Sequence, residues 1–329
     1  MTGAAHGGDS GGRGGLGGLG EFDRIARYFA PLAHPAGLGL ADDAAVWTPP
    51  TGLAVVMTVD QMIEGVHFLP DDPPDAVARK LLRRNLSDLA AMGAAPVGYL
   101  LTTALRADTP EAWLGGFAGG LRRDQAEFGI GLFGGDSSST AGPVMSSVTM
   151  FGTVTPGAAW RRGGAVAGDA VFVTGTIGDA ALGLAAARGQ LADPDGSLRE
   201  RRLLPAPRVG LALGGLVHAV IDVSDGLVQD VGHLCRAAGC GAVIEAALVP
   251  ASAAACAAGP DWLEQRLTGG DDYELVLAAP AANEEALRAA CGEVPLTRIG
   301  QFTDRHTDVI VCDETGQRIG LSRSGWTHF

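Results

Sequence analysis

Apolar and polar positions in the first half of the chain alternate between strand-like and helix-like patterns. Short apolar runs such as LAVVMTVD and VGYLLTTAL are typical of strands. Longer segments with apolar residues three and four apart are typical of helices, and one of them opens with Pro74 and closes near Gly93. The pattern predicts strand, helix, strand, helix, strand, strand over 53–60, 74–94, 97–105, 110–129, 130–136 and 144–154.

The second half restarts after PGAAWRRGGAVAGD (156–169), a segment rich in Gly and turn residues. Both halves mix helices with some consecutive strands, which favours two α+β layers over one doubly wound sheet. We therefore predict an α/β (α+β) fold with domains at 20–157 and 158–329. Expected strands are 170–175, 219–224, 241–246, 273–279 and 308–313, with a polar loop at 192–201 and helices at 179–189, 209–218, 225–239 and 283–292.

The N-terminal 19 residues, MTGAAHGGDSGGRGGLGGL, are of low complexity. Such a composition offers little apolar surface to offset the entropy of ordering, so residues 1–19 are expected to be a disordered leader. A phosphate-binding Gly loop would need a preceding strand, which this segment lacks. Order is expected to begin near Glu21, where EFDRIARYFAPL has helical spacing.

Composition narrows the classes of partner. The chain has 329 residues and a formal net charge of −13, which argues against nonspecific binding to nucleic acid or to an anionic membrane. No apolar run reaches the roughly 20 residues that span a bilayer, and the N-terminus has no secretory h-region. The five cysteines include no C-x-x-C pair and indicate reduced thiols in a cytoplasmic protein.

Several familiar site motifs are missing from the sequence. There is no G-x-x-x-x-G-K-[ST], and the single lysine, Lys80, lies in the middle of a predicted helix. No G-x-G-x-x-G follows a strand and opens a helix, no G-x-S-x-G elbow joins a predicted strand to a helix, and the seven histidines have no zinc spacing. A P-loop protein, a Rossmann dinucleotide site and a Ser-elbow hydrolase are therefore not expected.

Aspartates recur beside Gly, Ser or Asn in six separate stretches. These are GLADDAAV, TVDQMIEGVHF, NLSDLAAMGA, FGGDSSS, IDVSDGL and TGGDDYEL. Several follow apolar runs, and a carboxylate at the end of a buried strand needs a compensating charge. Because few cationic side chains lie nearby in the sequence, a bound cation is the natural partner. Oxygen-only ligands favour Mg²⁺, which commonly arrives with nucleotide phosphates.

Each stretch also has a simpler structural explanation. In FGGDSSS, backbone amides could approach a phosphate while Asp136 binds metal, but Gly-Gly-Asp is also a common turn. In IDVSDGL, Ser224 could cap the next helix with Asp225 in its first turn. Capping does not explain Asp222, which ends a strand.

The remaining candidates come from a helix and from loops. Asp88 lies on the same face of its predicted helix as Asn85, and an unpaired carboxylate facing a core would be destabilising. Asp271 precedes a predicted strand, Asp43 lies in a Gly-flanked loop, and His67 taken alone is more often a structural hydrogen bonder than a ligand. The recurrence of Asp at strand ends, rather than any one stretch, predicts a metal-dependent site.

Taken in order, these stretches resemble those of the thiamine-monophosphate kinases, a family of the superfamily named for aminoimidazole ribonucleotide synthetase. The resemblance covers residues 20–329, and NLSDLAAMGA, VTGTIGDAALGL and IDVSDGL-x-x-D carry it. It implies an N-terminal α/β domain that pairs in a homodimer, a C-terminal α/β domain, and ATP and Mg²⁺ in the cleft between them. The implied reaction is transfer of the γ-phosphoryl group of ATP to thiamine monophosphate, the last step of thiamine diphosphate biosynthesis.

The resemblance also implies roles for individual residues. Val59 stands where a hydroxyl residue is common, so it would contribute its backbone carbonyl; Asp271 stands where Glu is common, and Gln61, where Thr is common, has no assigned role. The implied catalytic residues are Asp60, Asp136 and Arg162. Metal binding falls to Asp43, Thr58, Val59, Asp60, Asp88, Asp136, Asp222 and Asp225, ATP binding to Gly134, Gly135, Asp136, Arg162 and Ser224, and thiamine monophosphate binding to His67, Asp271 and Trp326.

Direct transfer without a phosphoenzyme is the expected mechanism, because phosphoryl transfer needs positioning and charge neutralisation more than covalent help. Alternatives remain at this stage. Another ATP-dependent enzyme of the superfamily, of the aminoimidazole ribonucleotide synthetase or selenophosphate synthetase type, is one; residues 1–20 lack the Cys and Lys expected of the latter, and the aromatic ending SGWTHF favours a thiamine-like ligand. A non-catalytic divalent-metal-binding module is the other, although no D-x-D-x-D loop occurs.

Overall fold

The computed structural model describes residues 20–327, so the expected leader at 1–19 lies outside the described residues. The chain begins with α1 (Glu21–Arg24), which continues into a π-helical turn (Ile25–Phe29) and a 3-10 turn (Ala30–Leu32). This confirms a helical start near Glu21. Among the residues described, no helix combines the length and the apolar character needed to cross a bilayer.

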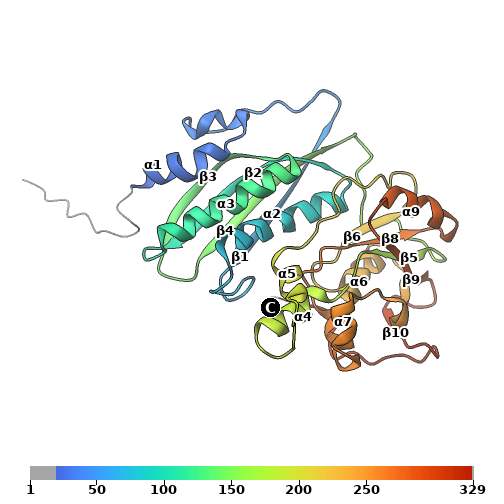
Figure 1. Ribbon diagram of the computed structural model, residues 1–329. Helices are drawn as coiled ribbons and strands as arrows, with labels where there is room; N and C mark the ends of the chain where they lie inside the picture. The colour runs from blue at the N-terminus through green and yellow to red at the C-terminus, as the bar shows by residue number, and fades with distance from the viewer. Residues whose placement is uncertain (1–19, 328–329) are drawn as a thin grey trace, which may run out of the picture.

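A four-stranded sheet forms the first half of the molecule. Its strands are β1 (Ala54–Ile63), β2 (Ala95–Arg106), β3 (Gly131–Thr140) and β4 (Met145–Val154), in the order β1-β4-β2-β3. Two long helices, α2 (Pro74–Ala91) and α3 (Glu111–Phe128), cover one face of this sheet (Figure 1). The predicted order of elements is confirmed.

The two faces of this sheet differ in what they bury. On the face under α2 and α3, the helix face, side chains such as Met62, Val148 and Met150 are fully buried in a core with Leu81 and Leu86 of α2. On the opposite face, which we call the open face, β1 and β2 leave large apolar side chains exposed. These are Val55, Met57, Val59 and Leu100, of which Met57 is 69% exposed.

A bulge decides which face the end of β3 presents. Tyr99 pairs with Leu132, but the next residue, Leu100, pairs with Gly134, so Phe133 is an extra residue in β3. Because side chains alternate in a strand, one extra residue transfers every later side chain to the other face. Asp136 consequently lies opposite Thr102 on the open face. The sequence placed Gly134–Asp136 at a strand end, whereas the strand continues through them.

A six-stranded sheet of order β10-β7-β9-β5-β8-β6 forms the second half. The helices α4 (Asp179–Ala187), α5 (Ser197–Leu203), α6 (Leu227–Ala238), α7 (Ala253–Ala257), α8 (Leu263–Thr268) and α9 (Glu284–Cys291) belong to this half (Figure 1). Its strands are β5 (Ala170–Thr174), β6 (Ala219–Asp222), β7 (Gly241–Glu245), β8 (Leu275–Ala279), β9 (Leu296–Thr303) and β10 (Val309–Cys312). Two sheets with their own helices confirm the predicted fold class.

Two predictions for this half are wrong. The segment 209–218 is not a helix, since Gly210 and Gly215 adopt positive φ and break it into turns. Its apolar residues instead pack against the second sheet, where Leu213 is fully buried. The expected loop at 192–201 contains the start of α5.

Helix α2 joins the two halves through buried polar contacts. The Ser87 hydroxyl donates to Asp222 at the end of β6 (2.8 Å), and the Lys80 ammonium donates to Asp271 (2.7 Å). A buried ion pair between Arg202 of α5 and Asp72 links the halves on another side. These contacts fix the position of the second domain against the N-terminal helix layer.

Candidate functional site

Three carboxylates from both halves lie near enough to one another beside α2 to interact electrostatically. Asp60 lies on the helix face of β1, Asp88 lies in the last turns of α2, and Asp222 ends β6. Each one acts electrostatically on another member of the group. We call Asp60, Asp88 and Asp222 the interdomain cluster.

Burial and mutual repulsion shift the acid–base behaviour of this cluster. Burial, with the charges of Asp222 and Asp60, raises the pKa of Asp88 to about 7. Burial and Asp60 likewise raise the pKa of Asp222 to about 6, although the hydrogen bond from Ser87 opposes the shift. Clustered oxygen ligands that resist ionisation suit a hard divalent cation, which would stabilise all three charges at once.

Polar side chains around the cluster hold its members in place. Thr58 donates a hydrogen bond of 2.5 Å from its hydroxyl to Asp88, and Arg84 donates from Nη2 to Asp60 at 3.2 Å. The exposed Arg162 lowers the pKa of both Asp88 and Asp222 and so lies close to them. The cluster therefore has two cationic side chains near it, one largely buried and one exposed.

Two of the Asp-rich stretches lie side by side in the second domain. The Asp271 amide donates to the Ser224 carbonyl (2.9 Å) and the Tyr273 amide to the Val223 carbonyl (2.8 Å). Asp271 and Tyr273 both adopt positive φ, of 73° and 53°. Non-glycine residues rarely adopt this conformation without support, and such strain is concentrated at functional sites.

Asp271 forms the centre of a second polar group. Its carboxylate accepts from the Lys80 ammonium (2.7 Å) and the Tyr273 hydroxyl (2.8 Å), and Lys80 also donates to the His67 carbonyl (3.3 Å). Burial alone would raise the pKa of Asp271, but Lys80 and Arg84 lower it to about 2. His67 and Asp271, two positions expected to bind substrate, are thus joined through Lys80.

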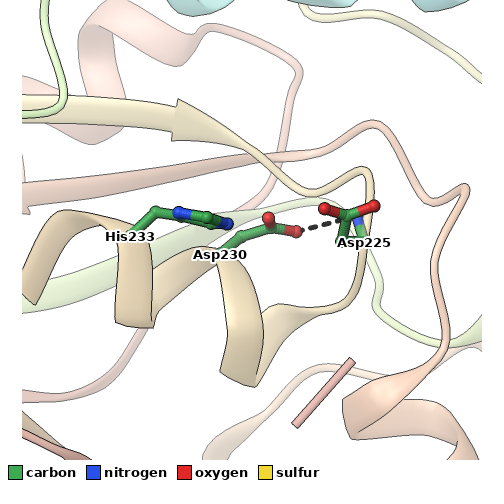
Figure 2. A group of neighbouring side chains, drawn as sticks. All are labelled: Asp225, Asp230 and His233. Carbon is green, nitrogen blue, oxygen red and sulfur yellow. Dashed lines mark hydrogen bonds between the residues drawn. The ribbon is translucent and has the colours of Figure 1, made fainter. Parts of the chain in front are cut away.

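Asp225, Asp230 and His233 form a further group at the start of α6 (Figure 2). The ligand atoms of these three residues lie within 4.8 Å of one another. The Asp230 carboxylate accepts from the amides of Asp225 and Gly226, both at 3.0 Å. Burial, with the charges of Asp222 and Asp225, raises the pKa of Asp230 to about 8.

This geometry rules out helix capping as the explanation of Ser224 and Asp225 in the IDVSDGL motif. Helix α6 begins at Leu227 with Gly226 as N-cap, so Ser224 does not cap it and Asp225 is not in its first turn. Asp230, the fourth residue of α6, instead holds the turn because its carboxylate accepts hydrogen bonds from the two amides. Trp326 lies beside the same turn, because its amide donates to the Asp225 carbonyl (2.9 Å), and its side chain is 48% exposed.

Four of the residues expected to bind ATP or metal lie on the opposite side of the first sheet. Asp43, Gly134, Gly135 and Asp136 line a cavity of about 960 Å³ over the open face of the first sheet. We call these four residues the open-face group. Gly135 has to be glycine, since a Cβ there would come within 1.9 Å of the Leu101 carbonyl oxygen.

The open-face group and the interdomain cluster do not meet within one chain. Asp60 is on edge strand β1 and Asp136 on the opposite edge strand β3, and their side chains point to different faces. Three strand spacings separate them, roughly 14 Å. Val59 is on the open face as well, 63% exposed, while Thr58 belongs to the cluster through its bond to Asp88.

Sequence reasoning missed the residues that organise the site, namely Lys80, Arg84, Ser87 and Asp230. One signal was present, since Lys80, Arg84 and Asp88 are spaced four apart and therefore share one face of α2. Three charged residues at this spacing along one helix face indicate a polar partner for that face.

Comparison with known families gives two matches that divide the chain as the sheets do. Residues 41–154 match the family model "AIR synthase related protein, N-terminal domain". Residues 166–313 match "AIR synthase related protein, C-terminal domain".

Individual relatives carry a more specific name. A thiamine-monophosphate kinase of Caulobacter vibrioides is 42% identical over 94% of this chain and 90% of the relative. The crystal structure of thiamine-monophosphate kinase from Stenotrophomonas maltophilia K279a has a TM-score of 0.78 and 38% identity, covering 85% of this chain and 91% of that one. A structure named as AaThiL complexed with AMPPCP and TMP has a TM-score of 0.74 and 29% identity, covering 94% and 97%.

Proposed function

This chain belongs to the thiamine-monophosphate kinase family, and we propose that its own residues carry out ATP-dependent phosphorylation of thiamine monophosphate as follows. The interdomain cluster is the phosphoryl-transfer centre. The observation that carries the proposal is the convergence of Asp60, Asp88 and Asp222 from three elements of both domains beside a cationic side chain.

Asp60, Asp88 and Asp222 would hold Mg²⁺, with Asp225 close by and Thr58 orienting Asp88. Their raised pKa values and all-oxygen character support this assignment, because a divalent cation relieves the repulsion that burial imposes. When bound, Mg²⁺ supplies charge neutralisation for the two reacting phosphates. Asp43, Asp136 and the Val59 carbonyl complete the set of expected metal ligands.

The two substrates approach the cluster from different sides. Arg162, exposed beside Asp88 and Asp222, and Ser224, in the adjoining turn, contact the ATP phosphates. The amides of Gly134 and Gly135 would reach the same phosphates only across a dimer interface. His67, Asp271 and Trp326 surround thiamine monophosphate. The AMPPCP and TMP named for the AaThiL complex support this pair of ligands.

The phosphoryl group passes directly from ATP to the acceptor phosphate. An oxygen of the acceptor forms the new P–O bond while the bond between the γ-phosphorus and the leaving ADP oxygen breaks. No general base is required, because a phosphate monoester with a second pKa near 6 is already largely ionised at neutral pH. Arg162 stabilises charge on the group in transit.

The active form is a homodimer. The open face exposes Val55, Met57, Val59 and Leu100, and exposed large apolar side chains gathered on one face are of the kind that marks protein–protein contacts. Asp43 and Asp136 lie over this same face, so within the dimer they reach a phosphoryl-transfer centre only across the interface. The dimer acts in the cytoplasm, where ATP and Mg²⁺ are available.

ADP formation measured with and without thiamine monophosphate tests the assignment. We expect turnover that requires both thiamine monophosphate and Mg²⁺ and that yields thiamine diphosphate. ADP formation indifferent to this acceptor would favour a different ATP-dependent enzyme of the superfamily. Covalent label on the protein after incubation with γ-labelled ATP would contradict direct transfer.

A further inference from the structure

Arg84 is a largely buried cation, with a side chain 12% exposed, whose hydrogen-bonding capacity is only partly used. Its guanidinium donates to Asp60 through Nη2 at 3.2 Å. Its Nε and Nη1 are buried and, among the described residues, have no acceptor. A guanidinium carries five N–H donors, and leaving such donors unpaired in a protein interior costs free energy. An oxygen-rich anion bound here would satisfy them.

The position of Arg84 on α2 indicates which anion binds there. Lys80, Arg84 and Asp88 follow one another at intervals of four residues along one face of the helix. At one end, Lys80 contacts Asp271 and the His67 carbonyl, where the proposed function places thiamine monophosphate. At the other end, Asp88 belongs to the interdomain cluster. Arg84 lies between the acceptor and the phosphoryl-transfer centre, where the acceptor phosphate has to be.

The other two cationic side chains of the site, Lys80 and Arg162, already have other partners or roles. The Lys80 side chain is 3% exposed, and its ammonium is engaged by Asp271 at 2.7 Å and by the His67 carbonyl. Arg162 is exposed on the side of Asp88 and Asp222 and serves ATP in the proposed function. Of these three cationic side chains, only Arg84 combines a location beside the acceptor with unused donors.

We propose that Arg84 binds the phosphate of thiamine monophosphate through its free guanidinium donors and so selects the phosphorylated form of the vitamin over thiamine itself. The inference rests on the proposed function and assigns a substrate contact within it. Arginine suits the task because its planar fork matches phosphate oxygens in pairs. The bond to Asp60 then keeps the guanidinium next to the centre where the γ-phosphoryl group arrives.

Binding measurements without nucleotide test the proposal directly. Calorimetric titrations of the full chain with thiamine monophosphate and with thiamine would be compared for wild type, Arg84→Gln and Arg84→Lys. Wild type is expected to bind the phosphorylated form more tightly. Arg84→Gln is expected to weaken that binding roughly 10- to 100-fold, the range for a charged hydrogen-bonding group, and to leave thiamine binding unchanged. Arg84→Lys is expected to fall between the two, because lysine keeps the charge but loses the paired donors.

Arg123→Gln is the matched control, since it removes an arginine from the surface of α3, where it pairs with Asp75. Its binding and turnover are expected to equal those of wild type. KM values add a second readout, with a rise for thiamine monophosphate in Arg84→Gln and little change for ATP. If Arg84 served only to orient Asp60, the variant would instead require more Mg²⁺ and lose ATP affinity.

The outcomes separate this inference from the proposed function. Wild-type turnover that depends on thiamine monophosphate, together with unchanged affinity for it in Arg84→Gln, overturns the role of Arg84 alone. An equal loss of thiamine and thiamine monophosphate binding also overturns it, because it shows general damage to the site. If Arg84→Gln does not fold, Arg84→Lys decides, and unchanged selectivity in that variant overturns the inference. A wild type that ignores thiamine monophosphate contradicts the proposed function itself.

Discussion

The interdomain cluster and the open-face group use the same side chain in different surroundings. Asp60, Asp88 and Asp222 are enclosed between two domains, and hydroxyl groups of Thr58 and Ser87 hold two of them. Asp43 and Asp136 are exposed and line a cavity with apolar side chains over the open face. The first set is assembled by the fold of one chain, whereas the proposed function requires assembly of two chains before the second can join a centre.

This difference has an energetic basis. Buried carboxylates that repel one another store unfavourable free energy, which a cation can release on binding. Exposed carboxylates are solvated and store little. We therefore expect changes in the interdomain cluster to alter metal affinity most. Changes in the open-face group should instead alter the activity that requires dimerisation.

The largest effect is expected from Asp222→Asn. Asparagine keeps the hydrogen bond with Ser87 but removes one charge from the cluster, so kcat/KM should fall by roughly 10²- to 10³-fold or more. The metal-free variant should unfold at a temperature equal to or higher than wild type, because a source of repulsion is gone. Steady-state ADP formation and thermal unfolding measure the two quantities.

Asp304→Asn, which changes an exposed aspartate of the second domain, is the control and should leave both quantities unchanged. Retention of more than about a tenth of wild-type kcat/KM in Asp222→Asn would remove this residue from the phosphoryl-transfer centre.

A mixing experiment tests whether the two groups meet across an interface. Asp60→Asn and Asp136→Asn are each expected to be inactive alone. If each centre takes Asp60 from one chain and Asp136 from its partner, every mixed dimer has one intact centre. Random mixing then restores about a quarter of wild-type activity, and the purified mixed dimer has about half of it. Co-expression with two different tags, followed by purification of the mixed dimer, makes the measurement.

If both residues came from the same chain, each centre would carry one of the two changes, and no activity would return. The matched control is a mixture of Asp60→Asn with Asp222→Asn. Both residues belong to the same cluster, so this mixture should stay inactive under the shared-centre arrangement.

How far the sequence foretells this arrangement depends on what each prediction requires. The apolar runs around Val56 and Tyr99 identify buried strands because burial itself selects those residues. Asp222 and Asp88 stood out for the same reason, since each is a carboxylate in an apolar context. The helix predicted at 209–218 failed because apolar spacing does not reveal that Gly210 and Gly215 turn the chain.

The sequence does not predict which face of the sheet Asp136 lies on. It depends on a single extra residue, Phe133, in the pairing of β2 with β3. Without that bulge, Asp136 would lie opposite Thr103 on the helix face, the same face as Asp60 of the interdomain cluster. Register is a tertiary property, set by packing on both strands, and local composition does not encode it. The sequence did not assign Lys80 and Arg84 to the site, because their partners, Asp271 and Asp60, are distant in sequence or on another element.

A moderate effect is expected from the turn that carries Asp225. Asp230→Ala leaves the amides of Asp225 and Gly226 without their acceptor, which should cost about 1–3 kcal/mol of stability. Loss of the fixed turn should also lower kcat/KM by about tenfold. Asp230→Asn retains an acceptor oxygen and, since the pKa of Asp230 is raised to about 8, resembles the protonated native residue. It should therefore be close to wild type, and equal damage in the two variants would argue against the clamp.

The smallest effect concerns the stability of the metal-free protein as pH changes. The pKa values of Asp88 and Asp222 are raised from 3.8 to about 7 and about 6, so between pH 4 and pH 7 the folded state binds more protons than the unfolded state. Stability then falls as pH rises through this window. The melting temperature should drop by several degrees between pH 5 and pH 8, on the order of 2–4 °C per kcal/mol.

Buried carboxylates outside the interdomain cluster set the background for that pH dependence. Burial is the largest cause that raises the pKa of Asp272 and of Asp230 to about 8. Both residues therefore also make stability fall as pH rises. Their contribution should persist when the cluster is altered. The part that belongs to the cluster is the part that saturating Mg²⁺ or Asp222→Asn removes, because the first neutralises the carboxylates and the second deletes one of them. A decline of equal slope with and without Mg²⁺ would mean that the cluster does not hold the cation, and the contrast between the two acidic groups would then have to be explained by burial alone.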